Sequence, residues 1–421
     1  MEYKKVSCNS YDIHTIKTDK FKTVRMEIIF SREVNREEMP FFTFLSDILT
    51  DSSLHYPRRK DIAIRLEELY KTTLYGITNK VGNLFTITFV TEFIAPEYIN
   101  DKNYLNDVLS FPFELLNNPN VNNNEFEITN FNIIKKRMKE EIESIKENAD
   151  KLAIINALTK MDKDSPSSFR VLGTLEQLDS ITPAKLYEYY LELFNHSNCD
   201  IFVIGNLEMN NVVDIIKKSY KNKVIKLYKP VLAVDNTSRK KSQIVKEKSN
   251  FVQSSLVMVY NINNLEKKLK DSAFHVFNYI LGSGGLTSKL YKNLRTDNSL
   301  CYGVRSLYLK YDSLLVIQVG LDNKNVSLAE KLIQKSVNEM ITGKYTEENI
   351  EDAKKNLVFS LKMGLDNNVS ILNNYVFNIF DNLPLLEDRI DLIKNVTKDD
   401  LMKCAKSLSL NTIYVQEAGD N

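Results

Sequence analysis

Cysteine and histidine are scarce in this 421-residue chain, and neither forms a closely spaced cluster. The four cysteines contain no Cys-x-x-Cys pair; they are Cys8, Cys199, Cys301 and Cys404. This spacing argues against a disulfide framework and against a cysteine zinc site. The four histidines also contain no short-spaced pair; they are His14, His55, His196 and His275.

Long apolar runs and an excess of charge of one sign are missing as well. The longest apolar stretches, such as SLLVIQVGL at 313–321, have the length of a strand and cannot span a bilayer. The N-terminal stretch also lacks an apolar run long enough for a signal peptide. Lys and Arg number 56 against 55 Asp and Glu, so net charge gives no support to a nucleic-acid or membrane partner. We therefore expect a cytoplasmic protein.

The chain is too long for one ordinary core, and its local patterns alternate between strand and helix. The stretches 23–31 and 83–90 alternate apolar and polar residues, as half-buried strands do. Between them, the pattern from Lys60 predicts a helix that stops at Gly76. The stretch from Asn124 to Asn148 predicts a long amphipathic helix.

Three of these features recur in the same order at an offset of about 220 residues, which indicates a duplicated domain. The helix-turn-strand pattern from Ile181 recurs from Val396, the long helix at Glu125 recurs at Glu348, and the strand at Met26 recurs at Leu256. We expect an N-terminal domain over 1–220, a polar linker over 221–243 and a C-terminal domain over 244–421.

The stretch LGSGGLTSKLYKNLRTDNSLCYGV at 281–304 first suggests a phosphate loop. It matches neither the Walker pattern nor the dinucleotide pattern, and a predicted helix precedes it where both motifs require a strand. We therefore expect Gly282, Gly284 and Gly285 to form a hinge that ends one helix, with Thr287 capping the next.

This layout, with an arginine late in the short helix and a tyrosine entering a strand, resembles the C-terminal half-domain of the pitrilysin/insulinase family of zinc metallopeptidases. The stretches 169–182, 200–206 and 343–357 add to the resemblance, which covers nearly the whole chain. It implies an α+β fold of two homologous domains, each a mostly antiparallel sheet covered by helices on one face, as in half of a metallopeptidase clamshell.

Active members of that family carry a His-x-x-Glu-His zinc motif and a distant glutamate ligand. At the matching positions this sequence has Thr43, Ser46 and Asp47, with Glu141 at the distant ligand position. Two carboxylates cannot replace two imidazoles, and Ser46 cannot serve as the general base. We therefore expect no zinc in this chain and no zinc hydrolysis by it alone.

Arg295 and Tyr302 match the pair that binds substrate opposite the zinc in the family. The resemblance therefore implies the non-zinc subunit of a heterodimer, whose partner is a homologous zinc-binding chain and whose substrate is a short unfolded peptide. Two alternatives remain open: a structural scaffold, in which Arg295 and Tyr302 only stabilise the fold, and a module that binds peptides without cleaving them.

Overall fold

The computed structural model describes residues 1–220 and 231–419, which form two compact units. The first unit comprises Met1–Glu143, Arg170–Val231 and Asn368–Asn373, and the second comprises Ser144–Phe169, Leu232–Asn367 and Asn374–Asn421. Of the expected linker 221–243, residues 221–230 lie outside the described residues. Residues 231–242 contain no helix or strand. No helix in the described part of the chain is both long and apolar enough to cross a membrane.

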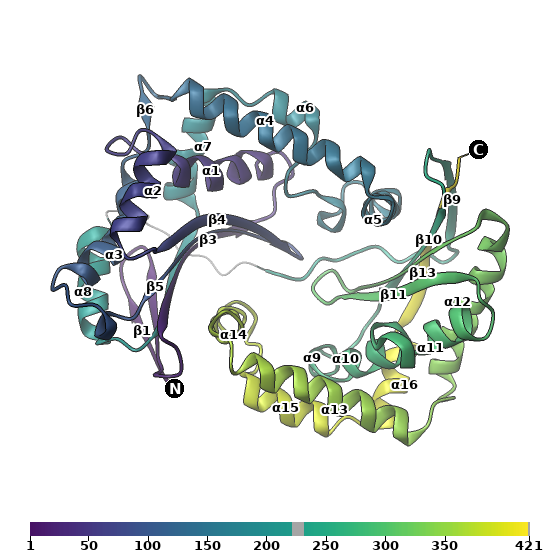
Figure 1. Cartoon of the computed structure of the whole chain (residues 1–421). Helices are drawn as coiled ribbons and strands as arrows, with labels where there is room; N and C mark the ends of the chain where they lie inside the picture. The colour runs from purple at the N-terminus through teal and green to yellow at the C-terminus, as the bar shows by residue number, and fades with distance from the viewer. Residues whose placement is uncertain (221–230, 420–421) are drawn as a thin grey trace. The chain divides into compact units, whose positions relative to one another are not determined.

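The first unit is built on a six-stranded sheet in which β3 is one of the two central strands (Figure 1). Its pairs are antiparallel except that of β2 with β8. The order is β1 (Glu2–Ser7), β2 (Asp12–Lys17), β8 (Asn198–Gly205), β3 (Thr23–Glu33), β5 (Leu84–Ile94), β4 (Thr73–Val81).

One face of this sheet carries the core of the first unit. Met26, Ile28 and Phe30 of β3 are fully buried, as the period-two pattern of the sequence predicts. Helices α1 (Met39–Asp51), α4 (Ile128–Ser144) and α7 (Pro183–His196) belong to this layer. Phe44 of α1 stacks on Phe131 of α4, with 4.8 Å between ring centroids. The α4 helix is shorter than the predicted helix over 124–148, because Glu125–Phe126 form a short strand and Ile145–Glu147 form a 3-10 turn.

Gly76 does not end a helix, contrary to the expectation from the sequence. The helix α2 (Arg59–Glu68) ends earlier, and Gly76 lies inside strand β4. A Cβ atom at Gly76 would lie 2.0 Å from the backbone oxygen of Ser46. The glycine is therefore required because α1 lies directly against β4 at this point.

The second unit repeats the strand order of the first around a five-stranded sheet (Figure 1). The order is β11 (Cys301–Leu309), β12 (Leu314–Leu321), β10 (Ser254–Ile262), β13 (Leu408–Glu417), β9 (Gln243–Lys248). Only the β13–β9 pair is parallel, as only the β2–β8 pair is in the first unit. Strands β4, β5, β3, β8 and β2 thus have equivalents in the same order, which is the arrangement that a duplicated domain produces. The α+β fold with mostly antiparallel sheets is confirmed.

The second sheet has helices on both faces, unlike the one-sided cover expected from the resemblance. Helices α10 (Ala273–Asn278), α12 (Val326–Ile341) and α16 (Lys398–Lys406) cover the face of Met258. On the other face, Ala153 and Ala157 of α5 (Ala149–Met161) pack against Val257 and Val316. The helix α5 precedes residue 220 in sequence but belongs to the second unit.

Candidate functional site

The side chains at three of the altered zinc-motif positions form hydrogen bonds or an ion pair with other groups of the protein. Thr43 is buried in α1 and donates a hydrogen bond to the backbone oxygen of Val171 at 2.9 Å. Ser46, one turn further, is also buried and donates to the backbone oxygen of Thr43 at 2.8 Å. Both hydroxyls therefore donate to backbone carbonyl groups, that of Ser46 within its own helix and that of Thr43 to a distant segment.

Asp47 forms an ion pair with Arg137 of α4, with 2.9 Å between the carboxylate and the guanidinium. Arg137 lies one helical turn before Glu141, so the expected ligand position neighbours a cation that already neutralises Asp47. His55 contacts Glu114 instead, at 2.6 Å from its Nδ1 atom. These four residues do not fit a zinc ion, because they offer no imidazole, the Thr43 and Ser46 hydroxyls donate to backbone carbonyls, and Asp47 is paired with an arginine.

A cluster that the sequence did not predict joins Asp12 and His14 of β2 to Asp200 of β8. Among the described residues it is the one group of at least three His, Cys, Asp or Glu side chains close enough to share a metal ion. The buried His14 ring lies 3.0 Å from Asp200 through Nε2 and 2.8 Å from the Tyr3 hydroxyl through Nδ1. Lys5 lies 2.6 Å from Asp12. The protein's own side chains thus satisfy the cluster without an added cation.

No spacing in the sequence could reveal this cluster, because Asp200 is far from His14 along the chain. The parallel pairing of β2 with β8 sets Asp12 opposite Asp200, and His14 opposite Phe202. The His14 ring stacks on Phe202 with 4.2 Å between ring centroids. Strand register therefore assembles the group.

The glycine-rich stretch of the second unit makes a tight connection, but its details differ from the expectation. A π-helical turn, Tyr279–Ser283, runs through Gly282, and the side chain of Ser288, not Thr287, caps helix α11 (Lys289–Tyr291). A Cβ atom on Gly282 would lie 2.6 Å from the Ser306 hydroxyl. Gly282 is thus needed for close approach to β11 rather than as a helix stop, while Gly285 has a φ of +66°.

Arg295 and Tyr302 are brought together at the start of β11. Arg295 donates a hydrogen bond from Nη1 to the backbone oxygen of Cys301 at 2.9 Å, and its guanidinium lies 4.6 Å from the centroid of the Tyr302 ring. The Tyr302 residue is 84% exposed, so it is no core aromatic. Burial raises the pKa of the Cys301 thiol, although the nearby Arg295 acts in the opposite direction. This thiol is therefore held protonated and is no candidate nucleophile.

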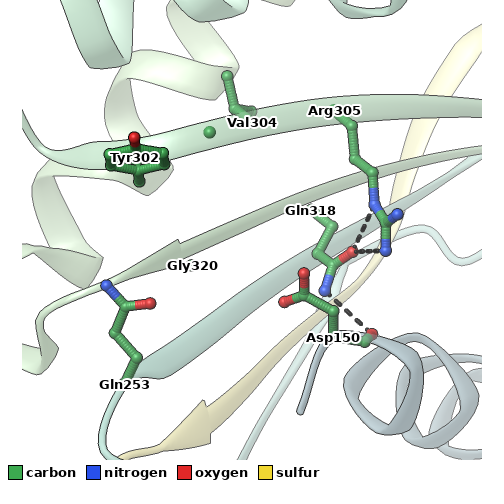
Figure 2. Close-up of a pocket in the computed structure, with 8 residues that line it drawn as sticks. Asp150, Gln253, Tyr302, Val304, Arg305, Gln318 and Gly320 are labelled. Atoms are coloured by element: carbon green, nitrogen blue, oxygen red, sulfur yellow. Dashed lines mark hydrogen bonds between the residues drawn. The ribbon is translucent and has the colours of Figure 1, made fainter. Parts of the chain in front are cut away.

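A bulge in β11 presents Tyr302. The register between β11 and β12 shifts between Cys301 and Val304, so Tyr302 and Gly303 fall outside the regular pairing. The phenol projects beside a pocket of about 360 Å³ that is also lined by Asp150, Gln253 and Gln318 (Figure 2). Arg295 and Tyr302 therefore form an accessible aromatic and cationic pair at the edge of a polar pocket.

Residues 180–357 match the family model described as "Peptidase M16 inactive domain". The chain thus resembles peptidases of the M16 family. The Bacillus subtilis (strain 168) protein named "Probable inactive metalloprotease YmfF" is 25% identical over 95% of this chain and 94% of its own length. "Non-peptidase homolog YmxG" of Helicobacter pylori is 25% identical over 68% of this chain and 64% of its own length.

The fold of this M16 homologue is also that of a solved structure. A conserved protein from Enterococcus faecalis V583 superposes with a TM-score of 0.93 at 26% identity, covering 100% of this chain and 99% of that one. The resemblance to this peptidase family seen in the sequence is confirmed by the matching family model and by the Bacillus subtilis relative. The altered motif of this chain thus accompanies similarity to a domain described as inactive and to relatives named as inactive or non-peptidase.

Proposed function

We propose that this M16 homologue is the non-zinc subunit of a heterodimeric zinc metallopeptidase. A homologous partner subunit holds the zinc, and the two chains complete a chamber for short unfolded peptides. In that complex, Arg295 and Tyr302 donate hydrogen bonds to carbonyl oxygens of the bound peptide. The catalytic metal belongs to the partner, because Thr43, Ser46, Asp47 and Glu141 of this chain are not a zinc ligand set.

The single observation that supports this proposal most is the exposed Tyr302 hydroxyl beside a positioned arginine. The ring is held by the guanidinium of Arg295, which Cys301 in turn anchors through its carbonyl. In the described part of the chain the hydroxyl itself has no hydrogen-bond partner. A phenol that is fixed through its ring but unused at its oxygen is suited to donate to an external carbonyl, where developing negative charge strengthens the bond.

The proposal is tested by reconstitution with a homologue that carries His-x-x-Glu-His. Each chain and the mixture are incubated with an unstructured fluorogenic peptide, and complex formation is followed by light scattering. We expect a one-to-one complex and cleavage only in the mixture. Cleavage by this chain alone that a chelator abolishes would contradict the division of roles, and so would the absence of any complex.

One observation supports the alternative that the chain is an inert structural or peptide-binding member of the family. The Arg295 guanidinium already contacts a ring and a carbonyl within its own chain, as a purely structural arginine would. Under this alternative the complex forms, but substitution of Arg295 or Tyr302 leaves its activity unchanged.

A further inference from the structure

The pocket beside Tyr302 has a fixed part, whose side chains are hydrogen-bonded to the protein, and an uncommitted part, whose polar groups have no partner among the described residues (Figure 2). Gln318 belongs to the fixed part. Its Oε1 accepts hydrogen bonds from Nε and Nη2 of Arg305 at 2.8 and 2.6 Å, and its Nε2 donates to the backbone oxygen of Asp150 at 3.0 Å and to the hydroxyl of Ser255 at 3.3 Å. All four hydrogen-bonding positions of this amide are used. Gln318 therefore positions its neighbours and does not bind a ligand.

The Asp150 carboxylate belongs to the uncommitted part. In the described part of the chain it has no hydrogen-bond or ion-pair partner, although its backbone oxygen is held by Gln318. Figure 2 shows the carboxylate directed into the space between Gln253 and Gln318. Arg305 also lines the pocket, but it is bonded to the Gln318 amide and forms no ion pair with Asp150. Asp150 is thus the one carboxylate lining the pocket, and it is available to a cation.

Two further groups complete the lining. The Gln253 amide has no partner among the described residues, so its oxygen can accept a hydrogen bond. The Tyr302 ring stands exposed at the rim. A carboxylate, an amide oxygen and an aromatic ring together complement a flat cation that carries several N–H donors.

We propose that this pocket binds the guanidinium of an arginine side chain in the substrate peptide. The inference rests on the proposed function, because it identifies a feature of the peptide that the complex would cleave. A guanidinium can form two parallel hydrogen bonds to Asp150 and can lie against an aromatic ring, whereas an ammonium offers only a point charge. The volume of about 360 Å³ is within the range of side-chain and small-ligand pockets.

The test uses the purified full chain without a partner and a pair of short labelled peptides. The two peptides are identical except that one carries arginine and the other citrulline, which has the same shape but no charge. We expect the arginine peptide to bind about fivefold more tightly in fluorescence anisotropy. In Asp150→Asn this ratio should fall to about one, because the carboxylate that discriminates the charge is gone.

Asp388→Asn is the matched control, because Asp388 is likewise an acidic residue in the first turn of a helix, α15 (Leu386–Lys394), but does not line the pocket. It should keep the preference for arginine. Equal affinity of the wild-type chain for the two peptides, no measurable binding of either, or an unchanged ratio in Asp150→Asn would overturn the inference. Because this assay contains no partner subunit, its result is separate from that of the reconstitution experiment.

Discussion

The guanidinium of Arg295 lies 4.6 Å from the centroid of the Tyr302 ring, and the same arginine donates a hydrogen bond to the backbone of Cys301. The contact connects a π-helical turn, Lys292–Thr296, to the bulge that begins β11. It fixes the direction of the ring while leaving the phenolic oxygen free for a ligand. The first two predictions concern this pair.

Tyr302→Phe should reduce turnover by the reconstituted heterodimer by about 100-fold. The change removes one hydroxyl donor but keeps the ring over Arg295, so the fold and complex formation should be preserved. The measurement is kcat with a fluorogenic peptide. Tyr98→Phe, at an exposed tyrosine of the first unit, is the control and should retain activity. Full activity in Tyr302→Phe would favour the structural alternative.

Arg295→Lys should lower kcat/KM of the heterodimer by about tenfold. Lysine keeps the charge but loses the planar donor set that contacts Tyr302 and Cys301, so the phenol should become less well oriented. Steady-state kinetics check this, with Arg59→Lys as the control at an exposed arginine of the first unit. Equal kinetics for wild type and Arg295→Lys would argue against a positioning role.

Metal analysis of the purified chain should find no zinc bound at the altered motif of α1 and α4. Asp47→Ala should therefore leave the metal content unchanged and should cost only about 0.5 kcal/mol of unfolding free energy, because its ion pair with Arg137 is partly exposed. One tightly bound zinc per chain that disappears in Asp47→Ala would contradict this. His14→Asn in the same assay distinguishes zinc bound at the Asp12–His14–Asp200 cluster, which this variant should remove, from zinc bound at the altered motif.

Gly76→Ala should destabilise the protein by about 2 kcal/mol or more, because the new Cβ atom would overlap the backbone of Ser46 and push α1 away from β4. Urea denaturation measures the change. Gly303→Ala is the matched control: a Cβ atom there meets no atom within 4 Å, so stability should be nearly unchanged. Similar losses in the two variants would show that the approach of α1 to β4 is not the cause.

Acid should selectively weaken the second unit through His275. Burial is the largest cause that lowers the pKa of His275 to about 4, with Arg389 and Lys310 adding repulsion and Asp271 acting in the opposite direction. The unfolded chain therefore binds a proton near pH 6.5 that the folded chain does not, so stability is lost as pH falls from about 6.5 towards 4. The contribution lost at pH 5 is about 2 kcal/mol. His275→Gln should flatten the dependence of unfolding free energy on pH over this interval, whereas an unchanged slope would contradict the assignment.

The sequence by itself determined the features that depend on local periodicity and on ordered repetition. The alternation in β3 placed Met26, Ile28 and Phe30 on one buried face because strand side chains repeat every two residues. The seven-residue separation of Arg295 and Tyr302 kept them within reach across a single turn. The sequence also showed that Thr43 and Asp47 stand where the zinc motif has histidines, because the residue types alone decide whether imidazole ligands are present.

The tertiary structure decided everything that depends on strand register and on close packing between distant segments. It joined His14 to Asp200 by pairing β2 with β8, and it placed Asp150 at the pocket by packing α5 on the second sheet. It also showed that Gly76 and Gly282 are set by neighbouring atoms rather than by helix ends. A sequence pattern reports on residues a few positions apart, whereas these relationships join residues that become neighbours only when the sheets form.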